Sequence, residues 1–463
     1  MMILLSVRDK YNKEKDGFKM MLIKKPWDYG QLKVNDNQRY LQNGDQPFFW
    51  MADTAWLLFH KLTLEESYIY LKNRKDKGFN IILADFIHTM GQTSADGSFA
   101  LVGDDFNKPD LDGKFWSHID RVIAMAEDLG LYMGLLPIWG SSIVGGGHMT
   151  MEEAESYSEF VTKRYGSRPN VIWITGGDIR GDVGRELFIK MAEIMKKNNP
   201  NNLVSFHPFG RTDSSMWFHQ EKWLDFNIFQ SGHRRYDQVS LGVWDDNTIT
   251  EEYFGEDNWK YVLRDHTMNP MKPTVDGEPS YEGALQGLHD DSQPFWETPD
   301  VRRYAYWSVF AGAMGHTYGD NSIMQFYNDP SKKGAYGAKD VWQQAIHHPG
   351  SDHMKHLLEL MTSIDYEKGK PADELLSLGQ KEKYDRVAVF ASEDYILCYD
   401  YNGNGFELNL ATYKGKELEG YWFDPTTGVY SFLGNIKPED KQSLIPHKRL
   451  NGGNDWVLVI KVN

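Results

Sequence analysis

The chain has 463 residues, of which 41% are hydrophobic and 25% are charged, and its formal net charge is −16. This composition is typical of a folded globular protein. The negative charge argues against nucleic acids and anionic membranes as partners, because both would be repelled. The length exceeds what one hydrophobic core usually supports, so we expect two domains.

Residues 1–30 are expected to form an amino-terminal extension. A very short apolar run is followed by charges and lacks a small-residue cleavage site, so it is not typical of a signal peptide. No stretch approaches the roughly 20 apolar residues that a membrane helix needs. The single cysteine, Cys398, lies in a strand-like run and is expected to be a buried thiol. Together these features favour a cytoplasmic location.

Residues 31–366 alternate between strand-like and helix-like patterns after a hairpin-like start. Eight short apolar runs are predicted to be strands: 48–56, 80–87, 131–140, 170–174, 202–208, 226–233, 272–280 and 315–319. The segments between them are long enough for helices, and Thr63 with Glu66 forms a capping box at the start of one. Eight strands that alternate with helices predict parallel pairing through right-handed crossovers. The pattern favours a (β/α)₈ TIM barrel, with an open doubly wound sheet as the alternative.

Residues 367–463 have a different pattern. Short alternating runs such as "RVAVFAS", "YILCYDY" and "WVLVIKV" are separated by the turn signals "NGNG", "DPTTG" and "NGGND". This pattern predicts a small antiparallel β-sandwich as an accessory domain. The domain could bind glycan or brace the barrel.

Polar and aromatic residues gather near the expected carboxyl ends of the strands, which form the active face of a TIM barrel. Asp178 and Glu278 follow the fourth and seventh predicted strands, so their carboxyl groups can face each other across a ligand. Cleavage of a glycosidic bond requires such a carboxylate pair. We predict that the other candidates contact the sugar: Asp53, Trp56, Asp85, His88, Trp139, His207, Gln230, His233, Trp244, Tyr281, His316, Tyr318 and Asp320.

Structural roles are the alternative for each of these residues. Asp53, Asp178 and Asp182 each precede a helix-like segment and could cap it. A chain with 14% aromatic residues has many in its core, and a lone histidine is more often a satisfied structural group. Glu282 is a poorer candidate than Glu278, because it is expected to lie beyond the strand.

Several longer motifs resemble the apiosidase-like glycoside hydrolases, family 140 and its relatives. The motifs occur in the expected order between residues 30 and 460: "GDQPFFWMADTAW", "RKDKGFNII", "WITGGD", "SFHPFGRTDSS", "WLDFNIFQSGH", "PTVDGEPSYEG" and "GHTYG". The resemblance implies a (β/α)₈ barrel, a collagen-binding-like β domain, and a catalytic pair at the "GGD" aspartate and the "GEP" glutamate. These residues are Asp178 and Glu278. Met324 departs from the tryptophan expected at its position.

The mechanism that we expect has Asp178 as the general acid, with its pKa raised by the apolar strand and by the opposing carboxylate. Glu278 would be the nucleophile or the base that activates water. Analogy with barrels that carry their acids after strands four and seven favours retention. The separation of the carboxyl groups decides between retention and inversion.

Other functions are not excluded by the sequence. The histidines of "AIHHPGSDHMKH" could bind a metal ion, but no HExxH or CxxC motif accompanies them, and we predict neither a metal nor a cofactor. A carbohydrate-binding protein without activity would not need both carboxylates. A metal-dependent hydrolase would lose activity with a chelator, whereas the carboxylate mechanism would not.

Overall fold

The first domain contains all eight predicted strands. The computed structural model describes residues 24–238, 254–449 and 453–463. The eight strands are β4 (Trp50–Thr54), β5 (Ile81–Asp85), β6 (Tyr132–Leu136), β7 (Val171–Ile179), β8 (Val204–Pro208), β10 (Asn227–Gln230), β11 (Thr274–Asp276) and β12 (Gly315–Tyr318). Nearly every residue in them is buried, as expected for strands covered on both faces.

These strands form a curled parallel sheet in two hydrogen-bonded parts. One part has the order β12-β4-β5-β6-β7-β8, and the other joins β11 and β10 to the short antiparallel β9 (Thr212–Asp213). β10 lies beside β8, and β11 lies beside β12. One backbone hydrogen bond bridges each gap in the described residues, from Asp225 N–H to Val204 O at 2.9 Å and from Met314 N–H to Thr274 O at 3.0 Å. The hydroxyl of Ser205 also donates to the backbone oxygen of Phe226 at 2.7 Å across the first gap. The strand order therefore follows the chain around the curl.

Helices follow the strands. They are α2 (Leu58–Lys61), α3 (Leu64–Asp76), α4 (Phe115–Asp128), α5 (Gly140–Ile143), α6 (Met151–Tyr165), α7 (Arg185–Asn198), α8 (Ser215–Phe218), α9 (Trp259–Asp265), α10 (Thr298–Phe310), α11 (Asn321–Met324), α12 (Trp342–Ala345) and α13 (Pro349–Thr362). The predicted Thr63–Glu66 capping box starts α3, and a second box, Thr150 with Glu153, starts α6. None of the described helices is long and apolar enough to span a membrane.

The segment before β4 forms a three-stranded antiparallel sheet instead of the expected hairpin. Its strands are β1 (Leu32–Val34), β2 (Leu41–Asn43) and β3 (Gln46–Phe48). A short 3-10 helix, η1 (Pro26–Tyr29), precedes the sheet. Most of the predicted extension 1–30 lies outside the described residues.

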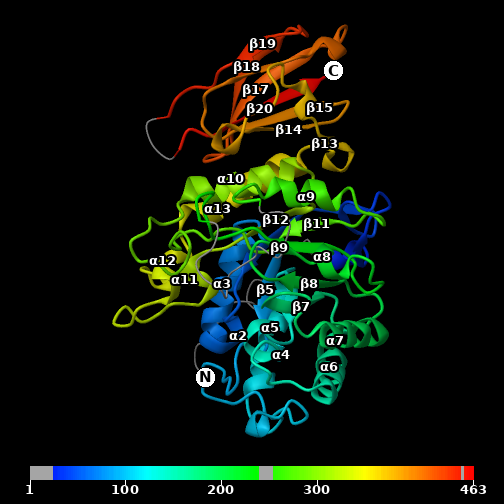
Figure 1. The fold of residues 1–463 in the computed structure, drawn as a ribbon, viewed down its shortest axis with the longest axis vertical. Coiled ribbons are helices and arrows are strands. Elements are labelled where there is room, and N and C mark those ends of the chain that lie inside the picture. The colour runs from blue at the N-terminus through cyan, green and yellow to red at the C-terminus, as the bar shows by residue number, and fades with distance from the viewer. Residues whose placement is uncertain (1–23, 239–253, 450–452) are drawn as a thin grey trace, which may run out of the picture.

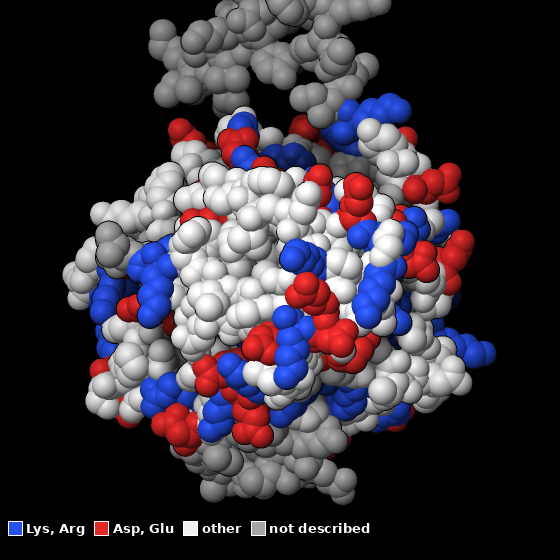
Figure 2. Space-filling view, turned by 90° about the horizontal axis from the view of Figure 1, so that it is seen from above, with Lys and Arg blue, Asp and Glu red and all other residues white. Residues whose placement is uncertain are grey.

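The carboxyl-terminal domain is antiparallel, as predicted. Its strands are β13 (Lys370–Pro371), β14 (Val387–Ala391), β15 (Tyr395–Asp400), β16 (Phe406–Leu408), β17 (Leu418–Asp424), β18 (Val429–Ile436), β19 (Gln442–Leu444) and β20 (Trp456–Val462). Six of them form one sheet, and β16 and β19 form a second, two-stranded sheet. Cys398 is buried in the core of this domain, as expected. Seen from above, the molecule presents a broad area without charged side chains, framed by charged ones (Figure 2).

This domain packs on α10 and α13 of the first domain (Figure 1). Tyr306 of α10 stacks on Tyr399 of β15 with ring centroids 4.6 Å apart. Arg302 of α10 binds Asp455 through two buried hydrogen bonds, Nε to Oδ2 at 2.8 Å and Nη2 to Oδ1 at 2.7 Å. The contact therefore combines apolar packing with a buried ion pair.

Candidate active site

A cavity of about 450 Å³ opens at the carboxyl ends of the strands. Eight of the predicted site residues line it: Trp56, His88, Trp139, Asp178, Gln230, His233, Glu278 and Tyr281. Asp178 belongs to the fourth strand of the curl, and Glu278 follows the seventh, as the strand count predicted. The two carboxylates therefore reach one cavity from different sides of the sheet.

The backbone around Asp178 has an unusual conformation. β7 continues to Ile179, so Asp178 lies within the strand and not beyond its end, and the register with β8 shifts between Gly176 and Ile179. Gly176, Gly177 and Asp178 have φ values of 87°, 109° and 48°. A Cβ atom on Gly176 would collide with the carbonyl oxygen of His207. The two glycines are therefore required by the close approach of neighbouring backbone.

This geometry also excludes the capping role for Asp178. α7 has Gly184 at its N-cap position, and no side chain caps the helix. The backbone N–H of Asp178 points instead to Nδ1 of His207, at 3.4 Å. The backbone of Asp178 is thus fixed by β7 and His207, and its partly exposed side chain lines the cavity.

Two histidines hold Glu278. Nε2 of His233 lies 3.0 Å from Oε1 of Glu278, and Nε2 of His207 lies 3.2 Å from Oε2. Since Nδ1 of His207 accepts from the Asp178 backbone, its proton belongs on Nε2, which faces the carboxylate. Both histidines can therefore stabilise Glu278 in its ionised form.

The two acids have opposite pKa shifts. Burial, and then the charge of Glu278, raise the pKa of Asp178 to about 6. Burial also disfavours the ionised form of Glu278, but the hydrogen bonds from His207 and His233 outweigh it and lower the pKa of Glu278 to about 2. Between these values Asp178 is protonated and Glu278 is ionised. The cavity thus contains a proton donor and an anionic nucleophile or base.

Aromatic side chains form one wall of the cavity. The rings of Trp56 and Trp139 lie 5.0 Å apart, and Nε1 of Trp56 donates to the hydroxyl of Tyr281 at 2.9 Å. The ring of Tyr281 also packs edge-on against His233 at 4.7 Å. The wall is therefore rigid and tied to the residues that hold Glu278.

His88 reaches the cavity with Asp85 behind it. The buried Asp85 lies 2.8 Å from Nδ1 of His88 and 2.8 Å from Nε2 of His60. Burial opposes charge on His88, but Asp85 outweighs it and raises the pKa of His88. His88 also stacks on Trp139, with centroids 5.1 Å apart. Asp85 thus orients His88 and does not line the cavity itself, contrary to the prediction that it contacts the sugar.

His207 was also predicted to contact the sugar, but it is fully buried, does not line the cavity and lies against Glu278 instead. Four further predicted residues lie away from the cavity, which corrects their assignment as sugar contacts. Asp53 is fully buried and bonded to Tyr70 and Arg74, both at 2.5 Å. His316 is fully buried within β12. The other two, Tyr318 and Asp320, bind Glu282 and the first turn of α11, respectively. Each belongs to the interior beneath the site. Trp244 lies outside the described residues.

Glu282 is a structural carboxylate and not a second candidate for catalysis. It accepts hydrogen bonds from the hydroxyls of Tyr318 and Thr298, both at 2.5 Å, and from the backbone N–H of Gly350 at 3.0 Å. We expect Glu282→Gln to keep kcat within a few-fold and to lower the free energy of unfolding by about 1–3 kcal/mol, because buried hydrogen bonds are disturbed. Kinetics on an aryl glycoside and denaturant unfolding would measure both. A loss of kcat comparable with that of Glu278→Gln would contradict this assignment.

The cavity also contains residues that were not predicted. They are Leu57, Phe209, Gly210, Arg211, Gly232, Arg234, Leu288, His289, Met324, Gln325, Ala335 and Tyr336. Phe209, Gly210 and Arg211 belong to the motif "SFHPFGRTDSS", Gly232 belongs to "WLDFNIFQSGH", and Met324 is the departure from the family pattern. The remaining residues lie outside the motifs that the sequence analysis used. Met324 lines the cavity, so this departure from the family pattern changes the wall of the candidate site.

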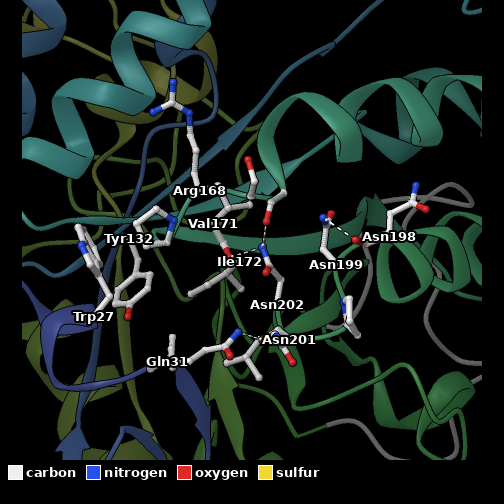
Figure 3. Close-up of a pocket in the computed structure, with 16 residues that line it drawn as sticks. Trp27, Gln31, Tyr132, Arg168, Val171, Ile172, Asn198, Asn199, Asn201 and Asn202 are labelled. Atoms are coloured by element: carbon white, nitrogen blue, oxygen red, sulfur yellow. Dashed lines mark hydrogen bonds between the residues drawn. The ribbon is translucent and has the colours of Figure 1, made fainter.

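A second cavity, of about 500 Å³, lies at the opposite ends of the strands (Figure 3). Val171 begins β7 and lines it, and its described lining includes no Asp, Glu or His. Of these two cavities, only the first is therefore lined by a pair of carboxylates. Within the described ranges, no group of three His, Cys, Asp or Glu residues is arranged to hold a metal ion. His348 of the histidine-rich segment binds Asp320 at 2.6 Å instead.

Comparisons with known proteins agree with this geometry. Residues 35–368 match the family model "Apiosidase-like, catalytic domain", and residues 371–461 match "Putative collagen-binding domain of a collagenase". A solved structure titled "Glycoside hydrolase" is 39% identical with a TM-score of 0.88, covering 95% of this chain and 98% of its own. A glycoside hydrolase family 5 structure from Bacteroides vulgatus is 36% identical, also with a TM-score of 0.88 and 95% of both chains covered. A search among curated proteins finds no match.

Proposed function

Because this chain belongs to the apiosidase-like glycoside hydrolases, we propose that it removes a terminal or side-chain sugar from a complex glycan, with an apiofuranoside as the first candidate. The observation that carries the proposal is the opposed ionisation of two carboxyl groups in one cavity. Asp178 has a pKa of about 6 and Glu278 a pKa of about 2. Glycoside hydrolysis needs one acid in each state.

The proposed reaction has two displacements. Asp178 protonates the glycosidic oxygen while Glu278 attacks the anomeric carbon, so the aglycone leaves as an alcohol and the sugar is bound to Glu278. Asp178, now ionised, takes a proton from water, and the resulting hydroxide displaces Glu278. The net result is hydrolysis with retained configuration. The two histidines on Glu278 support this course, because a carboxylate held ionised at both oxygens is ready to act as the nucleophile.

We further propose that the eight parallel strands act as one closed (β/α)₈ barrel. The adjacency of β8 with β10 and of β11 with β12 supports closure, as do the hydrogen bonds across both gaps. Closure would fix the ends of the fourth and seventh strands relative to each other. It therefore supports a constant separation of Asp178 and Glu278.

The substrate is tested with a panel of 4-nitrophenyl glycosides: β-D-apiofuranoside, α-L-arabinofuranoside and β-D-galactopyranoside. We expect release of nitrophenol from the apiofuranoside, because the chain belongs to the apiosidase-like family. Proton NMR of the first-formed sugar would report its anomeric configuration. A retained product supports the double displacement, and an inverted product overturns it in favour of direct attack by water.

The outcomes separate the substrate from the reaction. Cleavage of the pyranoside alone would overturn the furanoside proposal and leave the carboxylate mechanism intact. Activity that disappears with EDTA and returns with a divalent cation would overturn the mechanism itself.

A further inference from the structure

The cavity at the amino-terminal ends of the strands has the size of a ligand site. Its volume of about 500 Å³ lies within the range of roughly 300–1,000 Å³ that is typical of small-molecule sites. The segment of η1 and β1, the start of β7 and the loop 198–203 contribute its lining. It is separate from the catalytic cavity, because Val171 and Asp178 stand at opposite ends of β7.

Three amide side chains around this cavity have fixed orientations. The amide nitrogen of Asn202 donates to the backbone oxygens of Gly166 at 3.3 Å and Val171 at 3.2 Å. The nitrogen of Asn199 donates to the backbone oxygen of Asn198 at 2.9 Å, and that of Gln31 to the backbone oxygen of Asn201 at 2.5 Å. A backbone oxygen can only accept, so each nitrogen must face it.

The amide oxygens are consequently the groups left for a ligand. In the part of the chain that the structure describes, no hydrogen bond to Oδ1 of Asn202 or to Oε1 of Gln31 is found. Oδ1 of Asn199 also has no partner, but it is buried against Gly166 and is not open to the cavity. The cavity therefore offers preset acceptors to a ligand that carries hydroxyl groups.

The charged groups in the lining of this cavity favour an uncharged ligand. Arg168 lines the cavity and lies 3.1 Å from Glu127, while the described lining holds no carboxylate. A cationic ligand would find no carboxylate in the lining to pair with, and an anionic ligand would face amide oxygens and an arginine already paired with Glu127. A neutral, hydroxyl-rich molecule meets neither penalty.

Aromatic rings complete the site. Figure 3 shows Trp27 and Tyr132 to one side of the amides. Trp27 is partly exposed and packs edge-on against Tyr132, with centroids 5.3 Å apart. The hydroxyl of Tyr132 accepts from Asn43 at 2.5 Å, which leaves its own proton to donate. A sugar ring can place its C–H face on an indole and its hydroxyls on the amides.

We propose that this cavity is a second carbohydrate site, which binds a neutral sugar unit of a glycan and holds it away from the catalytic cavity. It would retain the enzyme on a polymer that carries many cleavable side chains. The inference does not depend on which glycoside is cleaved, since none of its residues lines the catalytic cavity.

The test measures binding of α-1,5-arabinotriose and β-1,4-galactotriose by isothermal titration calorimetry and saturation-transfer NMR. Trp27→Ala and Gln31→Ala remove a ring and an exposed amide without touching the carboxylates. Tyr29→Ala is the matched control, because Tyr29 belongs to the same 3-10 helix, is 49% exposed and does not line the cavity. We expect roughly tenfold weaker binding in both cavity variants, equivalent to about 1.4 kcal/mol, and no change in the control. kcat on an aryl glycoside should stay at the wild-type value in all three.

Other outcomes overturn the proposal. Equal binding by the wild type and both cavity variants would place the sugar elsewhere, and no binding of either trisaccharide would leave a cavity that holds solvent only. Stronger binding of trigalacturonate or of chitotriose in its cationic, deacetylated form would contradict the neutral ligand class. Circular dichroism would confirm that the variants fold, and Gln31→Ala preserves the test if Trp27→Ala does not.

Discussion

The Glu278→Gln variant is expected to lose roughly 10⁴-fold or more in kcat, because an amide can neither attack the anomeric carbon nor activate water. The change preserves the shape of the side chain, so His207 and His233 still face it. Activity on the cleaved nitrophenyl glycoside measures the loss. Azide should restore turnover in Glu278→Ala by entering the vacated space, and it should yield a glycosyl azide of inverted configuration.

Asp178→Asn tests the acid separately. Its loss of kcat should depend on the leaving group: large for an alkyl glycoside, and small for a 2,4-dinitrophenyl glycoside, which departs without protonation. Asparagine also tolerates the positive φ at this position, so the backbone is preserved. Asp182→Asn is the control, since Asp182 is exposed and paired with Arg180 at 2.9 Å. An equal loss on all leaving groups would contradict the role of Asp178 as general acid.

The value of kcat/KM is expected to fall above about pH 6. Asp178 must be protonated to act, and its pKa of about 6 means that the active fraction declines as pH rises through that value. Glu278 must be ionised, and its pKa of about 2 means that activity declines only as pH falls toward 2. A profile of kcat/KM against pH would show both limbs for the free enzyme.

The charge on Glu278 is one cause of the raised pKa of Asp178. Removing it with Glu278→Gln should therefore lower the pKa of Asp178, which NMR titration of carbon-13-labelled aspartate would detect. A matched titration of Glu282→Gln should leave the pKa of Asp178 unchanged. If the pKa of Asp178 stays at about 6 in Glu278→Gln, burial alone sets it, and the acids are less strongly coupled than the geometry indicates.

The strands were predictable from sequence because each is a short apolar run between helix-like segments. The meeting of Asp178 and Glu278 in one cavity was predictable for the same reason, because counting strands placed them on different sides of one sheet. For Asp53 and His316, counting strands could not tell whether the side chain lines the cavity or is buried beneath it. Both stand in strands, and the direction of a side chain there depends on residue alternation and on how the sheet curls. Arg211 and Tyr336 reach the cavity from loops, whose paths the pattern does not encode.

The buried Arg302–Asp455 pair and the Tyr306–Tyr399 stack link the folding of the two domains. Removing one partner of a buried ion pair is strongly destabilising, and the facing rings would be exposed to water. We therefore expect the catalytic domain and the β domain to unfold as one cooperative unit with a shared melting transition. A chain that is cut between them would present the aromatic face of α10 as a surface for self-association, so solubility and activity both depend on the intact chain.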